Sequence, residues 1–389
     1  MSASPVRARL ASLDAFRGAA VAAMILVNNP GSWAHLYAPL AHAPWHGCTP
    51  TDLVFPFFLF AVGNALALAP PADLARIARR TAWLFGLGLL LNIAPFVHWN
   101  ALGELVPRDP AQVRIMGVLQ RIALCYAAAA LLLRAWPAAR LPWAIGALLL
   151  GYWALAVAFG APGDAAWSLE GWLGTALDRT LLGEAHLYRG EGVPFDPEGL
   201  ASTLPAVAQV LIGVLVGQAF ARGLRAAHAD GIAAPPPLAR LLVWGAVLLV
   251  AGLVWSLAMP INKKLWTSSY VLYTSGWACL ALAALAWAVD ARRAHCFAVD
   301  TLLALGSNAL FIFVLSGLVP RVLGLIRWRG EAGEFTTPPR WLHDGLIAPA
   351  LSHVTSDARV ASLAYALLTV AAYAWLARAM RRRGIVVKV

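Results

Sequence analysis

Long apolar segments alternate with short polar ones along almost the whole chain. We count ten apolar segments, several of them long enough, at about 1.5 Å per residue, to cross about 30 Å of hydrocarbon. The pattern therefore predicts an all-α fold, a polytopic membrane protein with about ten transmembrane helices. The predicted spans cover residues 15–34, 52–69, 79–97, 115–133, 142–160, 203–221, 238–258, 268–289, 301–320 and 360–379.

The composition agrees with this pattern, and the charge distribution predicts the orientation of the chain in the membrane. Hydrophobic residues make up 60% of the sequence and charged residues only 13%, against about 25% charged in an average soluble domain. The net charge is +11, but the basic residues gather in alternate connections and the acidic residues in the others, with Lys263 and Lys264 as exceptions on the acidic side. Such a bias is an orientation signal rather than a sign of nucleic-acid binding, and it predicts cytoplasmic N- and C-termini.

The chain is expected to form a single transmembrane domain, 1–389. We divide it into halves 1–225 and 238–389, joined by a cytoplasmic loop that contains Pro235, Pro236 and Pro237. Two long outer connections, 161–202 and 321–359, are of the length that often carries function. The four cysteines show no metal-ligand spacing, so we predict no metal.

Residues that can carry acid–base chemistry gather in the first outer loop. His42 and His46 flank Trp45, and Asp52 opens the second predicted span. A neutral imidazole can accept a proton or attack an acyl carbonyl, and Asp52 can fix the tautomer of a histidine ring. The alternatives are an interfacial His–Trp cluster for the histidines and a helix-capping role for Asp52.

Two further groups lie beside predicted spans on the same side. Asn28 ends the first span and can donate to a developing oxyanion, or simply stop the helix before Pro30. Arg114, Gln120 and Arg121 lead into the fourth span, where a membrane-embedded arginine needs an acid, carbonyls or a ligand phosphate as partner. A structural ion pair is the alternative reading of these arginines.

Polar runs also precede the sixth and eighth spans. Before the eighth, lysines and hydroxyls at a helix start favour an anion site or a snorkelling membrane edge; the residues are Asn262, Lys263, Lys264, Trp266 and Ser269. Before the sixth, Asp196 and Glu198 form an acidic turn that can receive the hydroxyls or amine of a sugar, or cap a helix. No phosphate-binding loop or protease motif is present, which argues against an ATP-driven pump or a protease.

These segments, in order, resemble the heparan-α-glucosaminide N-acetyltransferase family and its bacterial relatives, a branch of the transmembrane acyltransferases. The matching blocks are Ser12-Leu13-Asp14 with Phe16-Arg17-Gly18, Val27-Asn28, His42-Ala43-x-Trp45-x-Gly47, Asp52-Leu53-Val54-Phe55-Pro56, Gly117-Val118-Leu119-Gln120-Arg121, Asp196-Pro197-Glu198-Gly199, Asn262-Lys263-x-Leu265-Trp266 with Ser269-Tyr270, and Gly306-x-Asn308.

The resemblance implies transfer of an acetyl group from cytosolic acetyl-CoA to the amine of a glucosamine across the membrane. His42 falls on the family's catalytic histidine, and Asn28 on an asparagine near the reacting centre. His46 falls on a variable position. We therefore assign the catalytic residues as His42, Asn28 and Asp52; the acetyl-CoA-binding residues as Arg114, Gln120, Arg121, Lys263, Lys264, Trp266, Ser269 and Asn308; and the substrate-binding residues as Trp45, His46, Asp196, Glu198 and Asn262.

The resemblance leaves two mechanisms open. His42 either deprotonates the attacking amine or carries the acetyl group transiently. Because the chain begins shortly before its first span, we expect no luminal N-terminal domain. The expected acceptor is an amino sugar or glycan on the periplasmic side of a bacterial inner membrane, and the protein can be a homodimer. A sugar transporter without transferase activity is the competing interpretation, and a non-catalytic scaffold is the third.

Overall fold

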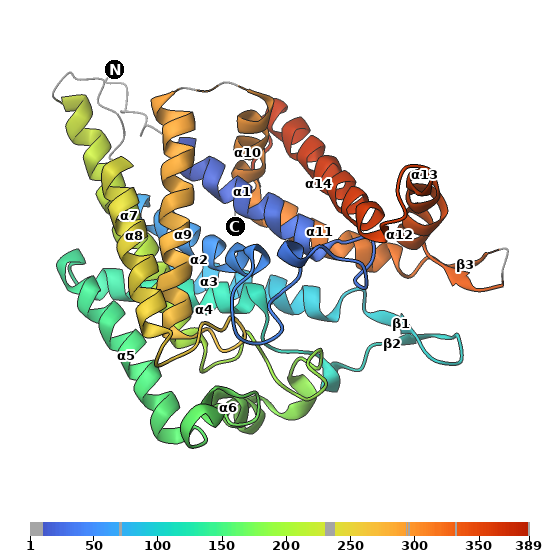
Figure 1. Cartoon of the computed structure of the whole chain (residues 1–389), viewed down its shortest axis with the longest axis horizontal. Helices are drawn as coiled ribbons and strands as arrows, with labels where there is room; N and C mark the ends of the chain where they lie inside the picture. The colour runs from blue at the N-terminus through green and yellow to red at the C-terminus, as the bar shows by residue number, and fades with distance from the viewer. Residues whose placement is uncertain are drawn as a thin grey trace.

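The computed structural model describes residues 11–69, 72–229, 238–292, 294, 296–330 and 333–387. The described chain is built from helices packed side by side, with only two short hairpins of strand (Figure 1). The ten helical regions that correspond to the predicted spans are α1 (Ala11–Asn28), α2 (Val54–Leu68), α3 (Leu74–Ile93), α4 (Val118–Ala135), α5 (Leu141–Phe159), α7 (Thr203–Ala229), α8 (Leu238–Trp255), α9 (Ser268–Ala286), the pair α10 (Phe297–Ser307) and α11 (Ala309–Leu323), and α14 (Ala358–Arg382).

The prediction of an all-α polytopic membrane fold is confirmed. In the described part of the chain, eight helices are long and apolar enough to cross a membrane, and the pair α10 and α11 makes a ninth if it counts as one span. The two helices of this pair meet at an angle of 85°, so the predicted straight span 301–320 is instead broken at Asn308. Helix α3 falls outside that count, and its first half carries three arginines, Arg76, Arg79 and Arg80.

The long helices alternate in direction, which places several helix starts on one side of the bundle. Near the start of α9, the Tyr270 hydroxyl donates to the carbonyl oxygen of Asp52 at the start of α2 (2.5 Å). In the same way, Arg121 in the first turn of α4 donates to the Gly199 carbonyl just before α7 (3.1 Å). The starts of α2, α4, α7 and α9 therefore converge, and we call this side of the bundle the site side.

Hydrogen bonds hold both described ends of the chain. The amide of Ser12 in α1 donates to Asp290 after α9 (3.3 Å), and Asn308 holds the segment that follows α14 through Ile385 (3.0 Å) and Val387 (2.8 Å). That both ends lie on one face of the membrane stays a prediction. The cytoplasmic placement of that face stays a prediction from the loop charges, and the Pro235–Pro237 loop that would join the two halves lies outside the described residues.

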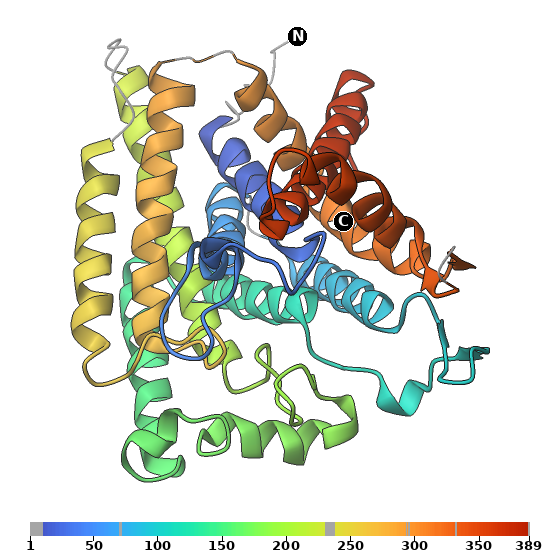
Figure 2. The same cartoon turned by 45° about the vertical axis from the view of Figure 1, so that its right-hand side comes forward.

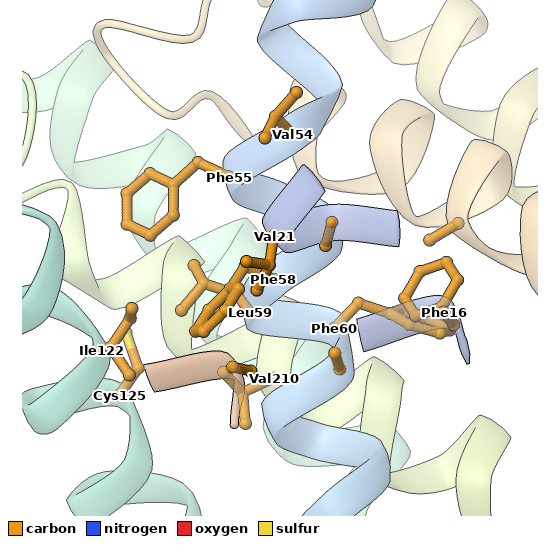
Figure 3. Packing of buried hydrophobic residues seen from close by; sticks show 14 of the residues in the cluster. Phe16, Val21, Val54, Phe55, Phe58, Leu59, Phe60, Ile122, Cys125 and Val210 are labelled. Atoms are coloured by element: carbon orange, nitrogen blue, oxygen red, sulfur yellow. The ribbon is translucent and has the colours of Figure 1, made fainter. Parts of the chain in front are cut away.

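The core lies where α1, α2, α4 and α7 pack together. Figure 3 shows Phe58 of α2 between Phe16 of α1 and Ile122 of α4, with Val210 of α7 beneath. The Phe16 ring of α1 stacks on Phe57 (5.5 Å between centroids) and meets Phe60 edge-on (5.8 Å). Helices α8 and α9 run side by side along one edge of the bundle, as both views show (Figures 1 and 2).

Most of the irregular structure lies in the connections on the site side. Residues 29–53 form a loop with two 3-10 turns, η1 (Ala38–Leu40) and η2 (Pro50–Leu53), and the amphipathic helix α6 (Leu173–Leu182) lies between α5 and α7. Hairpin β1–β2 (Val97–Trp99 and Leu105–Pro107) and hairpin β3–β4 (Trp328–Arg329 and Phe335–Thr336) project from the helices (Figure 1). A π-helix (Trp341–Ile347) and the short helices α12 (Pro338–Arg340) and α13 (Ala348–Ser352) precede α14.

The close packing of α2 on α7 generates a stability prediction. A β-carbon at Gly63 would lie 2.1 Å from the carbonyl oxygen of Val210 and 2.8 Å from the amide nitrogen of Val214, both of which are backbone atoms that cannot turn aside. Gly63→Ala should therefore destabilise the folded protein by about 1–3 kcal/mol or more. The melting temperature of the detergent-solubilised protein measures this loss.

Gly86→Ala is the matched control, because a β-carbon at Gly86 of α3 meets no atom within 4 Å. This variant should melt at or slightly above the wild-type temperature, since alanine favours a helix by about 1 kcal/mol over glycine. Equal melting temperatures for the two variants would contradict the close approach of α2 and α7.

Candidate active site

The candidate site is built around a histidine held by a buried carboxylate. Nδ1 of His42 lies 2.7 Å from Oδ1 of Asp52. The Asp52 side chain is 1% exposed, whereas the His42 side chain is 44% exposed. One edge of the ring is therefore fixed from inside the protein while the rest of the ring faces outward, which is the arrangement that a base needs if a substrate is to reach it.

Asp52 combines the two roles between which the sequence left a choice. Its Oδ2 accepts hydrogen bonds from the backbone amides of Thr49 and Ala43, both at 3.0 Å, and from the Thr49 hydroxyl at 3.1 Å. The Asp52 side chain accepts from the Thr49 amide and the Thr49 side chain accepts from the Asp52 amide, so the two residues form a capping box at the start of η2. The carboxylate thus caps the helix start with one oxygen and holds His42 with the other.

A second loop, between α8 and α9, lies directly against the first. The amide of Gly47 donates to the Ile261 carbonyl at 2.8 Å, and Nδ2 of Asn262 lies 3.4 Å from Nδ1 of His46. Nζ of Lys263 lies 3.1 Å from Nε2 and 3.2 Å from Nδ1 of His42. The structure therefore brings together His42 and Lys263, which the sequence assigned to separate catalytic and acetyl-CoA-binding groups.

Beneath these loops, Trp266 packs on a buried arginine. Trp266 is fully buried and has a backbone φ of 54°, a left-handed conformation that is rare for a bulky residue and frequent at functional sites. Its ring lies 5.0 Å from the guanidinium of Arg121 and 5.0 Å from the Phe55 ring. Arg121 donates to Gly199 and to the Ser202 hydroxyl, but its Nε and Nη1 have no hydrogen-bond partner among the described residues.

The acidic turn before α7 forms an ion cluster with Arg114. Arg114 donates two parallel hydrogen bonds to Asp196 (2.9 and 2.6 Å) and one to Glu198 (2.5 Å). Burial alone would raise the pKa of the Glu198 carboxyl, but the charges of Arg114, Arg121 and Lys263 outweigh it and lower that pKa. Both acids are at least nine-tenths buried. The structural ion pair considered for Arg114 is therefore present.

The remaining aromatic and basic residues of the loop lock it in place. The Trp45 indole donates to the Trp167 carbonyl (2.8 Å), and Nζ of Lys264 lies 5.5 Å from the Trp45 ring. Lys264 also donates to the Pro44 carbonyl (2.8 Å) and to Glu191 (2.6 Å). The loops that carry His42, Glu191 and Lys264 are thereby tied to one another.

Four of the predicted site residues lie outside this group of contacts. Asn28 is exposed at the end of α1, and no hydrogen bond joins it to His42 in the described structure. Gln120 is buried near Asn92 and Gly117, and Ser269 donates to the Met259 carbonyl (2.6 Å). Asn308 lies at the break between α10 and α11, where its amide holds the segment after α14.

Sequence reasoning left out two residues that the structure places in the site. Glu191 pairs with Lys264, and the Tyr270 hydroxyl holds the backbone of Asp52. Tyr270 stood next to Ser269 in a matching block, whereas nothing in the sequence distinguished Glu191 from the other acids of its long connection. In the described part of the chain, no group of three or more His, Cys, Asp or Glu side chains could hold a metal ion.

Comparisons with known proteins identify the family of the chain. A family model described as heparan-alpha-glucosaminide N-acetyltransferase, catalytic, matches residues 9–253. Two curated relatives carry the name heparan-alpha-glucosaminide N-acetyltransferase. The one from Homo sapiens is 29% identical over 355 residues, covering 75% of this chain and 50% of its own length. The one from Mus musculus is 28% identical over 346 residues, covering 73% and 50%. The chain thus spans about half the length of these relatives, and the resemblance seen in the sequence is confirmed.

Asp178 of α6, beneath the acidic turn, generates a pH-dependent prediction. Burial raises the pKa of its carboxyl to about 6, although the Leu200 amide that donates to it at 2.8 Å acts in the opposite direction. Because this pKa is higher in the folded than in the unfolded chain, the group stabilises the fold most below its ordinary pKa. That contribution is lost as the pH rises through about 6, and it amounts to at most about 3 kcal/mol.

Asp178→Asn removes the titrating group while keeping the side-chain shape. The variant should lose less stability than wild type between pH 5 and pH 7, as measured by melting temperatures at both values. Asp164→Asn, which changes an exposed acid of the same connection, serves as the control and should follow the wild-type curve. If Asp178→Asn also follows the wild-type curve, the buried carboxyl does not titrate in this range.

Proposed function

The chain belongs to the heparan-alpha-glucosaminide N-acetyltransferase family of transmembrane N-acetyltransferases, and we propose that it transfers an acetyl group from acetyl-CoA to the amine of an amino sugar or glycan. The observation that carries this proposal is the hydrogen bond from His42 to the buried Asp52. Amine acylation needs a group that takes a proton from nitrogen, and this pair provides one at a surface that a substrate can reach.

In the proposed mechanism, Asp52 accepts a hydrogen bond from Nδ1 of His42 and leaves Nε2 as the reactive atom. His42 then either removes a proton from the attacking amine or accepts the acetyl group itself as an acyl carrier. The capping box fixes the position of Asp52, so the orientation of the ring follows from the start of α2. Both routes use the same two residues in the same geometry.

The interior of the bundle supports a path for the acyl donor. Buried polar atoms without a hydrogen-bond partner among the described residues occur on Asn64 of α2, Gln120 and Arg121 of α4, and Gln218 of α7. Unpaired polar groups in an apolar interior are costly, so they favour a polar ligand. The pantetheine arm of an acyl-CoA carries two amides that can pair with such groups. We propose that the arm passes between these helices toward His42, with its nucleotide on the cytoplasmic side.

The loops of the site side are proposed to receive the acceptor. Trp45 and His46 are partly or fully exposed beside His42, and Asn262 adjoins them. An aromatic face with nearby amide and imidazole groups suits the ring and hydroxyls of a sugar. The relatives' names specify heparan glucosaminide; for this chain we propose the wider class of amino sugars and glycans on the outer side of a bacterial inner membrane.

The test is release of CoA thiol from acetyl-CoA by the purified protein in proteoliposomes, with glucosamine as acceptor. The wild type should release CoA over many turnovers only when the acceptor is present, and His42→Ala should lower this steady rate by about 10²- to 10⁴-fold. His353→Ala, which removes an exposed histidine before α14, should keep the wild-type rate. A His42→Ala rate equal to wild type would refute the role of His42. If the vesicles move labelled glucosamine but release no CoA, the protein is a transporter.

Asp52→Asn tests the orienting role separately. The amide of asparagine carries no negative charge and has only one oxygen to accept hydrogen bonds. It cannot hold the His42 ring and also accept from the backbone amides of Ala43 and Thr49, so kcat should fall by about 10²- to 10⁴-fold. The KM for acetyl-CoA should change little. Melting temperatures measured in parallel distinguish loss of catalysis from loss of the helix cap, because a variant that merely unfolds would lose both.

A further inference from the structure

The imidazole of His46 is held by a side-chain amide whose direction is fixed. Asn262 is fully buried, and its Oδ1 accepts a hydrogen bond from the Leu265 amide at 2.9 Å. The oxygen of this side chain is therefore engaged within its own turn, and its nitrogen Nδ2 lies 3.4 Å from Nδ1 of His46. Because an amide NH₂ group can only donate, Nδ1 of His46 is the acceptor. Backbone pairing of Gly47 with Ile261 and Asn262 keeps the two loops in register.

This contact determines which nitrogen of His46 carries the hydrogen. In a neutral imidazole one ring nitrogen donates and the other accepts. Partial burial lowers the pKa of His46 below its ordinary value of about 6.5, so the ring is neutral at pH 7. With Nδ1 accepting from Asn262, the hydrogen lies on Nε2. The residue is exposed, and Nε2 has no hydrogen-bond partner among the described residues. The ring therefore offers a free N–H group to a ligand.

His42, in the same loop, has the opposite arrangement. The Asp52 carboxylate can only accept, so Nδ1 of His42 at 2.7 Å donates to it and Nε2 keeps the lone pair. The two rings also lie over neighbouring positions of the facing loop, because Asn262 contacts His46 and the next residue, Lys263, contacts His42. The first outer loop therefore presents a hydrogen-bond acceptor and a hydrogen-bond donor to the same region of the surface.

An amine with a hydroxyl group on the neighbouring carbon matches this pair of rings. The amine gives its proton to a base, whereas the hydroxyl oxygen accepts a hydrogen bond. An amino sugar such as glucosamine carries its amine beside a hydroxyl-bearing carbon. Trp45, which lies between the histidines in the sequence, is fixed by its hydrogen bond to the Trp167 carbonyl, and its ring lies 6.3 Å from the His46 ring. A simple primary amine would engage His42 but leave the N–H of His46 unused.

We propose that His46 is the specificity-determining residue of the acceptor site: its Nε2–H donates to the hydroxyl oxygen beside the acceptor amine, so vicinal amino alcohols bind better than simple primary amines. This inference rests on the proposed function, because it places the acceptor amine at His42. His46 takes no part in the proton transfer, so its loss weakens acceptor binding more than it slows the chemical step. Asn262 is a positioning residue, since it acts only by setting the tautomer of His46.

The first measurement needs neither ligand nor activity. The ring carbon and nitrogen chemical shifts of isotope-labelled histidine distinguish the two neutral tautomers, and the His46 signals are those missing from the spectrum of His46→Gln. At a pH well above 7, the wild-type signals should be those of the Nε2–H form. In Asn262→Asp a carboxylate that only accepts replaces the donor, so the signals should change to those of the Nδ1–H form. Wild-type signals of the Nδ1–H form would overturn the inference.

The second measurement compares trans-2-aminocyclohexanol with cyclohexylamine, two ligands of similar shape that differ by one hydroxyl next to the amine. Calorimetric titration of the detergent-solubilised protein should show about five- to tenfold tighter binding of the amino alcohol, which is typical of one hydrogen bond. His46→Phe keeps an aromatic ring without the N–H and should reduce this ratio to about one. His46→Gln keeps a side-chain N–H and should retain most of the ratio. An unchanged ratio in His46→Phe would show that His46 does not select the hydroxyl.

His35→Phe is the matched control. His35 is an exposed histidine of the same loop, but its Nδ1 contacts the Ser32 hydroxyl at 3.2 Å instead of the facing loop. This variant should keep the wild-type ratio, and size-exclusion profiles identify any variant that fails to fold. If His35→Phe lowers the ratio as much as His46→Phe does, the selection belongs to the loop as a whole and the inference is overturned.

The third measurement is kcat/KM for CoA release from acetyl-CoA with the same two acceptors. The ratio of the two values should follow the binding ratio in each variant, and the loss in His46→Phe should appear in the KM for the amino alcohol more than in kcat. If the binding ratios change as expected but the wild type releases no CoA, the proposed function fails while recognition by His46 stands. If CoA is released and His46→Phe keeps both ratios, the role of His46 fails alone.

Discussion

The arrangement of the site depends on one buried carboxylate. Asp52 is 1% exposed, and a charge removed from water is tolerated only when hydrogen bonds replace its hydration. The chain meets this requirement by folding residues 42–49 around the carboxylate, so that Ala43 and Thr49 donate to one oxygen and His42 to the other. The need to satisfy Asp52 therefore fixes the loop, the start of α2 and the orientation of the imidazole together. Removing the carboxylate would affect all three.

The same principle explains the second buried cluster. Asp196 and Glu198 share Arg114, and the starts of α4 and α7 lie next to them with their positive dipole ends toward the acids. Two carboxylates and one paired guanidinium leave a net negative group, which the neighbouring Arg121 and Lys263 offset. Charge balance thus links the turn before α7 to the loop that carries Lys263. The hydrogen bonds of Arg114 hold the turn before α7 in place, and the charges of the cluster act on the neighbouring site residues.

The sequence predicts the parts of this molecule that depend on local patterns. A helix lies at each of the ten predicted spans, and eight or nine of them in the described part of the chain are long and apolar enough to cross a membrane. Hydropathy predicts them well because the requirement for an apolar surface acts residue by residue. The contact between His42 and Asp52 could also be predicted locally. The two residues are only ten positions apart, and the loop before the helix start folds His42 onto the carboxylate that caps this start. The break at Asn308 was not accessible, since apolar residues continue on both sides and only packing against the segment after α14 reveals the bend. The contact between Lys263 and His42 was equally hidden, because it arises when two loops far apart in sequence pair.

The site draws on residues from both of the halves that the sequence predicts. His42, Asp52 and the Arg114 cluster come from the first half, whereas Asn262, Lys263 and Tyr270 come from the second. Contacts from the second half support the first: the charge of Lys263 acts on Glu198, and the Tyr270 hydroxyl donates to the backbone carbonyl of Asp52. Helix α9 contacts α1, α2 and α7, so the second half reaches the site through the core rather than along the surface. The site is therefore a property of the assembled bundle, and its electrostatics require both halves at once.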